Sequence, residues 1–164
     1  MRRLVAAAAV LLASCGAESR DPVERWLETG FALKLSDSAS TSGEATAPLD
    51  LTEFRALTVG MTRVTVPAFS LEVLEFDPTT PTQLASGEVS LSDGAAAGFT
   101  AAFRDLPVGE NGRKDVSVEA SAQDATALLL GKTSASLTLK YVLDVVPARF
   151  NLRVRVKLRA AEAP

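Results

Sequence analysis

Apolar and polar residues alternate along the last part of the chain, which is the pattern of strands that bury one face. Two runs show the alternation most clearly. Their apolar positions are Leu137, Leu139, Tyr141, Leu143 and Val145 in the first run, and Phe150, Leu152, Val154, Val156 and Leu158 in the second. The intervening side chains are mostly polar, so both runs are predicted to be β-strands with one face toward a core.

Two arrangements fit the link between these strands. A hairpin across Pro147-Ala148 would match Val145 with Phe150 and keep the hydrophobic register coherent. However, proline cannot adopt the positive φ of the favoured two-residue turns, and Lys140 would face Arg155. A wider corner, or a crossing between two sheets, fits these residues at least as well.

Other short strands precede this pair, separated by turn residues. Strand patterns cover residues 31–35, 57–66, 70–76, 87–92, 99–106 and 114–122. Pro67 separates the second pattern from the third. Asn111-Gly112 supplies residues that tolerate the positive φ of a hairpin. Residues 36–48 are rich in Ser, Thr, Gly and Ala without periodicity, which predicts a loop. The spacing of the strands predicts one antiparallel β-sandwich, with a small β-barrel as the alternative.

Helix signals are few. Asp21 as N-cap, Pro22 at the first helical position and Gly30 after the end predict one short N-terminal helix over residues 23–29. Residues 50–53 fit the start of a helical turn, although a short turn leading into a strand is favoured. The apolar run 125–130 fits either a helix or a buried strand.

The first residues form a separate unit. Arg2 and Arg3 precede an uncharged run over residues 4–13, which is about half the length that a helix needs to cross a bilayer. A positive start and a short apolar run are typical of a signal peptide, predicted here over residues 1–14. The run ends in Leu12-Ala13-Ser14-Cys15-Gly16, which resembles the lipobox of bacterial lipoproteins.

The resemblance implies a lipid anchor. In that class a diacylglyceryl group is attached to the cysteine sulfur, a signal peptidase cuts before it, and the new amino terminus is acylated, often with palmitate. Cys15 would then be the lipid attachment site, residues 15–20 a lipidated tether and residues 21–164 a single β-sandwich domain. Several acyl chains hold a protein stably on a membrane. Gly16, where inner-membrane lipoproteins carry Asp, implies the outer membrane, with the periplasmic face of the inner membrane as the alternative.

Composition narrows the possible chemistry. The chain has no histidine and one cysteine, which excludes histidine-dependent triads, imidazole zinc sites and a disulfide framework. No cofactor or metal is expected, and we predict that the protein is not an enzyme. Without Arg2 and Arg3 the mature chain has 15 cations against 20 acids, a balance that does not favour nucleic acid as a partner.

One charged row stands out within this acidic chain. It consists of the outward positions of the last strand, Arg149, Arg153, Arg155, Lys157 and Arg159, with Asn151 in line. Such a basic stripe is a candidate site for an anion or an acidic partner. The competing interpretation is an ordinary solvated strand face, in which arginines protect an edge from aggregation and neighbouring strands supply acids.

Two functions fit the sequence. The first is a lipid-anchored envelope protein, on the membrane through its anchor, that acts as a non-catalytic binding module for another envelope protein or an anionic polymer. The second is a carrier or chaperone for an apolar ligand held between the sheets. A cavity of several hundred Å³ between the sheets would favour the carrier, whereas a filled core would favour the interaction module.

Overall fold

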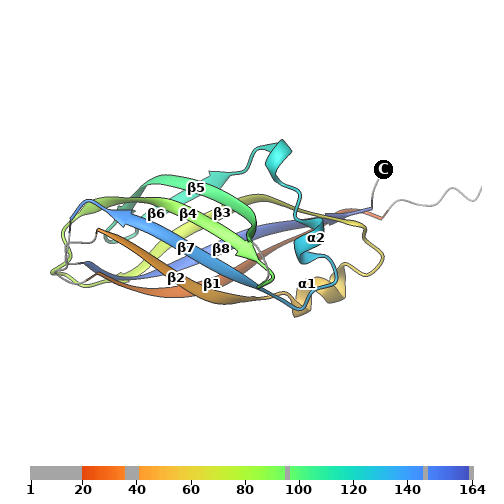
Figure 1. Ribbon diagram of the computed structural model, residues 1–164, viewed down its shortest axis with the longest axis horizontal. Helices are drawn as coiled ribbons and strands as arrows, with labels where there is room; N and C mark the ends of the chain where they lie inside the picture. The colour runs from red at the N-terminus through yellow and green to blue at the C-terminus, as the bar shows by residue number, and fades with distance from the viewer. Residues whose placement is uncertain (1–19, 36–40, 95–96, 146–147, 163–164) are drawn as a thin grey trace, which may run out of the picture.

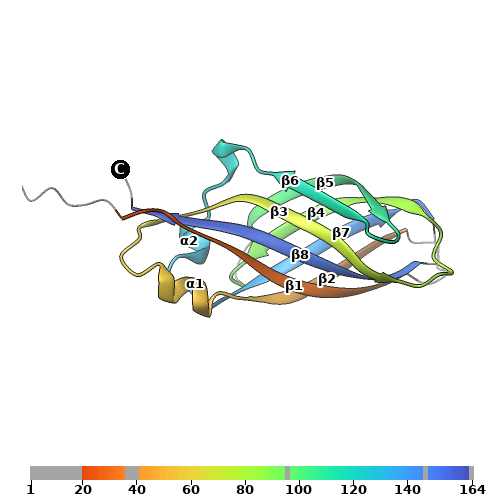
Figure 2. The ribbon, with the colours of Figure 1, turned by 180° about the vertical axis from the view of Figure 1, so that it is seen from behind.

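Eight antiparallel strands form two four-stranded sheets that pack face to face, as Figure 1 shows from one side and Figure 2 from the other. The computed structural model describes residues 20–35, 41–94, 97–145 and 148–162. Cys15 and the predicted signal peptide therefore lie outside the described residues. The prediction of an all-β sandwich is confirmed, and the sandwich is open rather than closed into a barrel.

Sheet A and sheet B each contain four strands. Sheet A has the order β1 (Val23–Leu35), β8 (Ala148–Ala161), β3 (Arg63–Phe76) and β6 (Arg113–Ser117). Sheet B has the order β2 (Ser42–Asp50), β7 (Ser134–Leu143), β4 (Gln83–Ser92) and β5 (Ala97–Val108). The helices are α1 (Thr52–Leu57), α2 (Thr126–Leu129) and the 3₁₀ turn η1 (Ala120–Ala122). This strand order is that of a jelly roll, in which the chain passes repeatedly from one sheet to the other.

The core lies between the sheets and is lined by alternate residues of every long strand. On β8, Phe150, Leu152, Val154, Val156 and Leu158 are all buried, as their alternation predicted. The apolar row of β7 is buried up to Leu143, whereas Val145 lies beyond the strand and is 42% exposed. The rings of Tyr141 and Phe150 make a T-shaped, edge-to-face contact across the core, with centroids 6.4 Å apart.

The two clearest strands do not form a hairpin with each other. β7 belongs to sheet B and β8 to sheet A, so the chain passes from one sheet to the other between Leu143 and Ala148. Of the two arrangements that fitted the sequence, the crossing is correct. The unfavourable opposition of Lys140 and Arg155 is thereby avoided, since Lys140 pairs with Glu44 and Glu88 in register instead.

Two predictions about the N-terminal part are wrong. Residues 23–29 form the first half of β1 rather than a helix, because all thirteen residues of β1 pair with β8 from Val23 opposite Ala160 to Leu35 opposite Ala148. Residues 42–48 belong to β2 rather than to a loop. β2 is an edge strand, where Gly43 and Pro48 cost little because only one side of the strand must donate to a ladder.

Three further segments differ from the sequence prediction. The segment starting at Thr52 forms the helix α1 instead of a turn leading directly into a strand. The run 125–130, for which the sequence left a helix or a buried strand open, contains the helix α2. Asn111 adopts a φ of 60°, as expected at a turn, but β5 and β6 on either side of it lie in different sheets. β3 runs through Pro67 as one strand, with a register shift between Thr65 and Ala68 that accommodates the proline.

Sheet A is extended at one end, where the short helices cover its inner face. Val64, Leu158 and Ala160 are fully buried there. The hydroxyl of Thr126 accepts a hydrogen bond of 3.0 Å from the Val64 amide, and the Ala125 amide donates to the Val64 carbonyl. α1 and α2 lie at this end in Figure 1, close to the point where the described chain begins and ends. Among the described residues, neither helix approaches the length and apolarity needed to cross a membrane.

We expect Gly87→Ala to destabilise the sandwich strongly. A Cβ at Gly87 would collide with the carbonyl oxygen of Lys140 and the Cα of Tyr141, both backbone atoms of the paired strand β7. Overpacking of this kind costs about 1–3 kcal/mol of unfolding free energy. Gly30→Ala is the control, because a Cβ there meets no atom within 4 Å. Urea denaturation followed by circular dichroism measures both; equal stability of the two variants would contradict the β4–β7 pairing.

Candidate functional site: the outer face of sheet A

The predicted basic stripe lies on the outer face of β8, along the middle of sheet A. Its members are Arg149, Arg153, Arg155, Lys157 and Arg159, which alternate with the buried core positions. β8 lies between β1 and β3, so the idea that these arginines protect an exposed edge is wrong. An inner strand places its charges between two neighbouring strands, and the residues of those neighbours decide what the stripe can bind.

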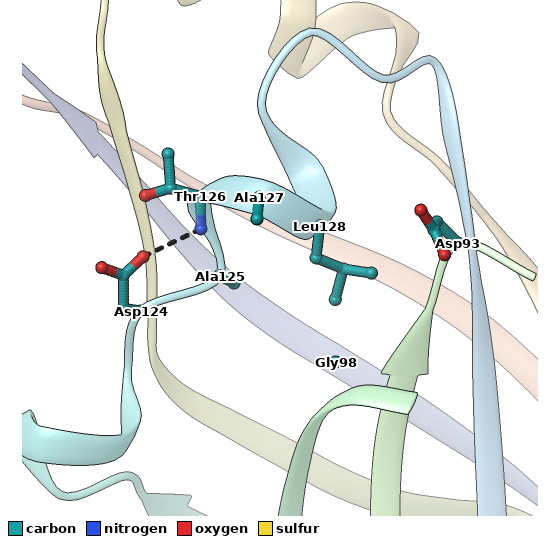
Figure 3. A pocket seen from close by; sticks show the side chains of 7 residues that line it. All are labelled: Asp93, Gly98, Asp124, Ala125, Thr126, Ala127 and Leu128. Carbon is teal, nitrogen blue, oxygen red and sulfur yellow. Dashed lines mark hydrogen bonds between the residues drawn. The ribbon is translucent and has the colours of Figure 1, made fainter. Parts of the chain in front are cut away.

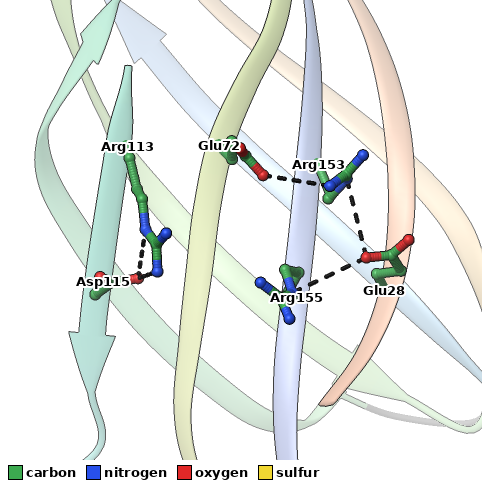
Figure 4. Close-up of polar contacts among 6 residues, drawn as sticks. All are labelled: Glu28, Glu72, Arg113, Asp115, Arg153 and Arg155. Carbon is green, nitrogen blue, oxygen red and sulfur yellow. Dashed lines mark hydrogen bonds and ion pairs between the residues drawn. The ribbon is translucent and has the colours of Figure 1, made fainter. Parts of the chain in front are cut away.

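Acids from both neighbours reach the centre of the stripe. Arg153 lies between Glu28 of β1 and Glu72 of β3, with nitrogen–oxygen distances of 3.9 Å and 3.5 Å (Figure 4). Arg155 shares Glu28 at 3.9 Å. The neighbouring strands thus supply acids, as the solvated-face interpretation predicted. The result is a mixed-charge network rather than an uninterrupted basic surface.

The same arrangement continues toward the end of β8. Lys157 Nζ lies 2.7 Å from Glu24 Oε2, and Arg159 lies 3.8 Å from the other oxygen of this carboxylate. A hydrogen bond from Lys157, assisted by the charges of Lys157 and Arg159, holds the pKa of Glu24 below its ordinary value of 4.5. Glu24 is therefore ionised at neutral pH and offsets both cations.

A further acid and base extend the network to β6. Asp115 lies opposite Ser70 in the β3–β6 register, and Arg113 donates to Asp115 Oδ1 at 3.2 Å (Figure 4). Hydrogen bonds from Ser70 and Arg113 lower the pKa of Asp115, and the charge of Arg155 contributes. The network consequently spans all four strands of sheet A.

An exposed tryptophan belongs to the same face. Trp26 of β1 is 43% exposed, and the Arg155 guanidinium carbon lies 5.4 Å from its ring centroid, within the range of a cation–π contact. The sequence does not mark Trp26 as part of this face, because the signals around residues 23–29 predict a helix rather than a strand. Only the pairing of Trp26 with Lys157 in the β1–β8 register brings the ring beside Arg155.

Arg149 lies apart from this network, at the other end of β8. Its backbone amide donates to the Thr80 hydroxyl at 3.0 Å, and its carbonyl accepts from the Asp77 amide at 2.9 Å. Hydrogen bonds from Thr79, with a contribution from the charge of Arg149, lower the pKa of Asp77. Arg149 thus helps to fix the 77–80 turn, where a hollow of about 270 Å³ is lined by Phe76, Asp77 and neighbouring residues.

A second hollow of about 680 Å³ lies beside α2, outside the core (Figure 3). Its lining consists of Asp93, Gly98, Asp124, Ala125, Thr126, Ala127 and Leu128. Asp124 accepts a hydrogen bond of 2.9 Å from the Thr126 amide, which lowers the pKa of Asp124. Among the described residues, no three acids or other metal-binding side chains gather in a way that would hold a metal ion. The hollow is an open surface feature and not a cavity between the sheets.

Comparisons with known proteins give only distant structural likenesses. No family model and no curated protein matches the sequence. The decameric BFDV capsid protein has 9% identity and a TM-score of 0.46, over 85% of this chain and 99% of that one. VP2 of the infectious bursal disease virus subviral particle has 13% identity and a TM-score of 0.41, over 88% of this chain and 38% of that one. A chain in the structure of turnip yellow mosaic virus at 100 K has 8% identity and a TM-score of 0.34, over 87% of this chain and 95% of that one.

These scores support no inference about function. The strand order and the mixed-charge face define this chain as a jelly-roll β-sandwich with a charged and partly aromatic outer surface on sheet A.

We expect Lys157→Met to raise the pKa of Glu24 toward 4.5, because the hydrogen bond from Lys157 is the largest cause of its lowering. A carboxyl group whose pKa is lowered by folding stabilises the fold at pH values above its pKa in the unfolded chain. This stabilisation is lost as the pH falls through the pKa of the folded state. Carbon-detected NMR titration of the Glu24 carboxyl measures the shift. Lys34→Met, at the opposite end of β1, is the control and should leave Glu24 unchanged. An unaltered Glu24 titration in Lys157→Met would refute the pairing.

Proposed function

We propose that this protein is a lipid-anchored envelope protein that acts as a non-catalytic interaction module. The outer face of sheet A is its docking surface for another envelope protein. The anchor is inferred from the lipobox-like sequence around Cys15, and Gly16 favours the outer membrane, with the periplasmic face of the inner membrane as the alternative. The contact between Trp26 and Arg155 is the observation that supports the docking surface most directly.

Trp26 and Arg155 have the character of an interface anchor. Tryptophan and arginine are enriched among the residues that contribute most to protein–protein binding. The Arg155 guanidinium over the ring restricts its freedom before binding, which would lower the side-chain entropy that binding costs. The ring remains 43% exposed, which leaves apolar area for a partner to cover.

The charge pattern favours a protein partner over an anionic polymer. A polyanion would have to compete with Glu24, Glu28 and Glu72 for cations that these acids already neutralise. A folded partner can instead match the alternating charges position by position, which provides specificity and register more than affinity. We therefore narrow the two candidate partners to a protein with complementary charges.

The carrier hypothesis has one supporting observation, the hollow beside α2. Its volume is in the range of small-molecule sites, and Ala125 and Leu128 supply apolar lining. The carrier hypothesis, however, places the ligand between the sheets, where the inner rows of β7 and β8 are buried against each other in one core. An open hollow flanked by Asp93 and Asp124 is a poor site for a wholly apolar ligand, so the interaction module remains the better proposal.

Co-purification of the lipidated protein from detergent-solubilised bacterial envelopes tests the docking surface. We expect Trp26→Ala to lower recovery of the specific partner at least about tenfold, because hot-spot truncations cost about 2 kcal/mol or more. Arg155→Glu should have a similar effect, since it also removes the contact with Trp26.

Lys140→Glu on the outer face of sheet B is the matched control and should retain the partner. Lys140 is exposed and lies between Glu44 and Glu88 in register, much as the stripe residues lie between acids. Loss of the partner in the control alone, or retention in both sheet A variants, would place the docking surface elsewhere.

A further inference from the structure

The 57–60 turn, which comprises the last residue of α1 and the turn residues after it, holds two aliphatic side chains in solvent. Leu57 is 43% exposed and Val59 is 71% exposed, the highest value among the large apolar residues exposed on the described surface. The turn is nevertheless well fixed, because Phe54, Thr58 and Met61 around it are buried. The Met61 amide donates to the Thr58 carbonyl at 3.1 Å, and Gly60 takes the positive φ of 88° that closes the turn.

Exposure alone does not assign a role to this turn. Leu84 and Val142 on the outer face of sheet B are 46% and 48% exposed. They lie at the end of sheet B away from α1, since Val142 pairs with Ser42 at the start of β2 and Leu84 lies at the start of β4, whereas α1 follows the end of β2. The distinguishing feature of the turn is its position relative to the N-terminal tether. Arg20, the first described residue, donates a hydrogen bond of 2.9 Å from Nη1 to the Val59 carbonyl.

The tether is short. Cys15 precedes Arg20 by five residues, and five fully extended residues span at most about 17 Å. Lipid on Cys15 would therefore hold Arg20, and with it the 57–60 turn, close to the bilayer surface. The exposed residues of sheet B are much farther away, since the eight residues from Ser92 back to Leu84 on β4 span about 26 Å.

The surroundings of the turn suit a lipid headgroup region. Arg20 and Arg55 lie beside Val59, and Arg55 and Val59 line a hollow of about 220 Å³ with Leu130 and Gly131. Asp21 and Glu53 are also near in sequence, so the region has no strong net positive charge. Contact of this turn with a membrane would therefore depend on the apolar side chains and on the tether. The two arginines could reach the lipid phosphates.

We infer that Leu57 and Val59 insert into the interfacial region of the membrane when the protein is anchored, with Arg20 and Arg55 at the level of the lipid phosphates. This inference rests on the proposed lipid anchor and adds an orientation to it. The strands of both sheets then run away from the membrane, and the outer face of sheet A points sideways toward neighbouring proteins. The bilayer that holds the lipid anchor is also the surface that covers Leu57 and Val59.

Site-specific fluorescence tests the inference on the full lipoprotein. Cys15 is the only cysteine of the chain, and its sulfur is acylated in the anchored protein, so Val59→Cys can be labelled alone with an NBD fluorophore. The probe is a vesicle of phosphatidylethanolamine and phosphatidylglycerol with and without lipid bearing a shallow doxyl quencher. Leu84→Cys, labelled in the same way, is the matched control because its exposure is similar to that of Leu57.

We expect doxyl lipid to lower NBD emission at position 59 by about half or more, and to leave position 84 unchanged, as interfacial insertion of only the turn requires. Leu57→Cys should behave like Val59→Cys and guards against a local effect of one label. Circular dichroism verifies that each variant is folded.

Flotation and intact mass on the same samples separate the two proposals. Lipidated protein that floats with the vesicles but shows no quenching at either 57 or 59 would overturn the orientation and leave the anchor intact. Equal quenching at 59 and 84 would also overturn it, because the sandwich would then lie along the membrane. Protein without lipid mass that does not float would refute the anchor, and this inference with it.

Discussion

The structure depends most on the pairing of one long strand, β8, with β1 and β3. Its inner row from Phe150 to Leu158 fills the core, and its backbone pairs with thirteen residues of β1 on one side and with β3 on the other. Because side chains alternate across a strand, burying one row necessarily places Arg153, Arg155 and Lys157 together on the opposite face. The charged surface is thus a direct consequence of the register that builds the core.

The same register neutralises that surface. Glu24 and Glu28 of β1 lie opposite Arg159 and Arg155 of β8 in the register. Glu72 of β3 lies opposite Arg153. Individual exposed pairs of this kind contribute little to stability, because water and salt screen the attraction. Their main effect is on the surface pattern, because they turn a row of cations into a pattern of both signs with one aromatic residue, Trp26, at its side.

Some of this arrangement could be predicted from the sequence, and the physical reasons for the rest are specific. Strict alternation identified both faces of β7 and β8, because each strand has one clearly buried side. The first half of β1 was missed because Asp21, Pro22 and Gly30 imitate helix boundaries, and pairing with β8 overrides such local signals. β2 was missed because its inward positions are Gly43, Ala45 and Ala47, too small to mark a hydrophobic face. The ion pairs and the Trp26–Arg155 contact were not predictable, since they depend on which strands are neighbours in space.

We propose that this jelly roll is held on a membrane by lipid on Cys15. The proposed compartment, the proposed envelope partner and the inferred orientation of the charged face all depend on that anchor. Intact-mass analysis and fractionation of the protein expressed in a bacterial host, wild type beside Cys15→Ser, test it most directly. We expect a membrane-bound wild-type species that lacks residues 1–14 and has added lipid mass, with both properties lost in the variant. An unmodified soluble wild-type protein, or one that retains its first residues, would contradict it.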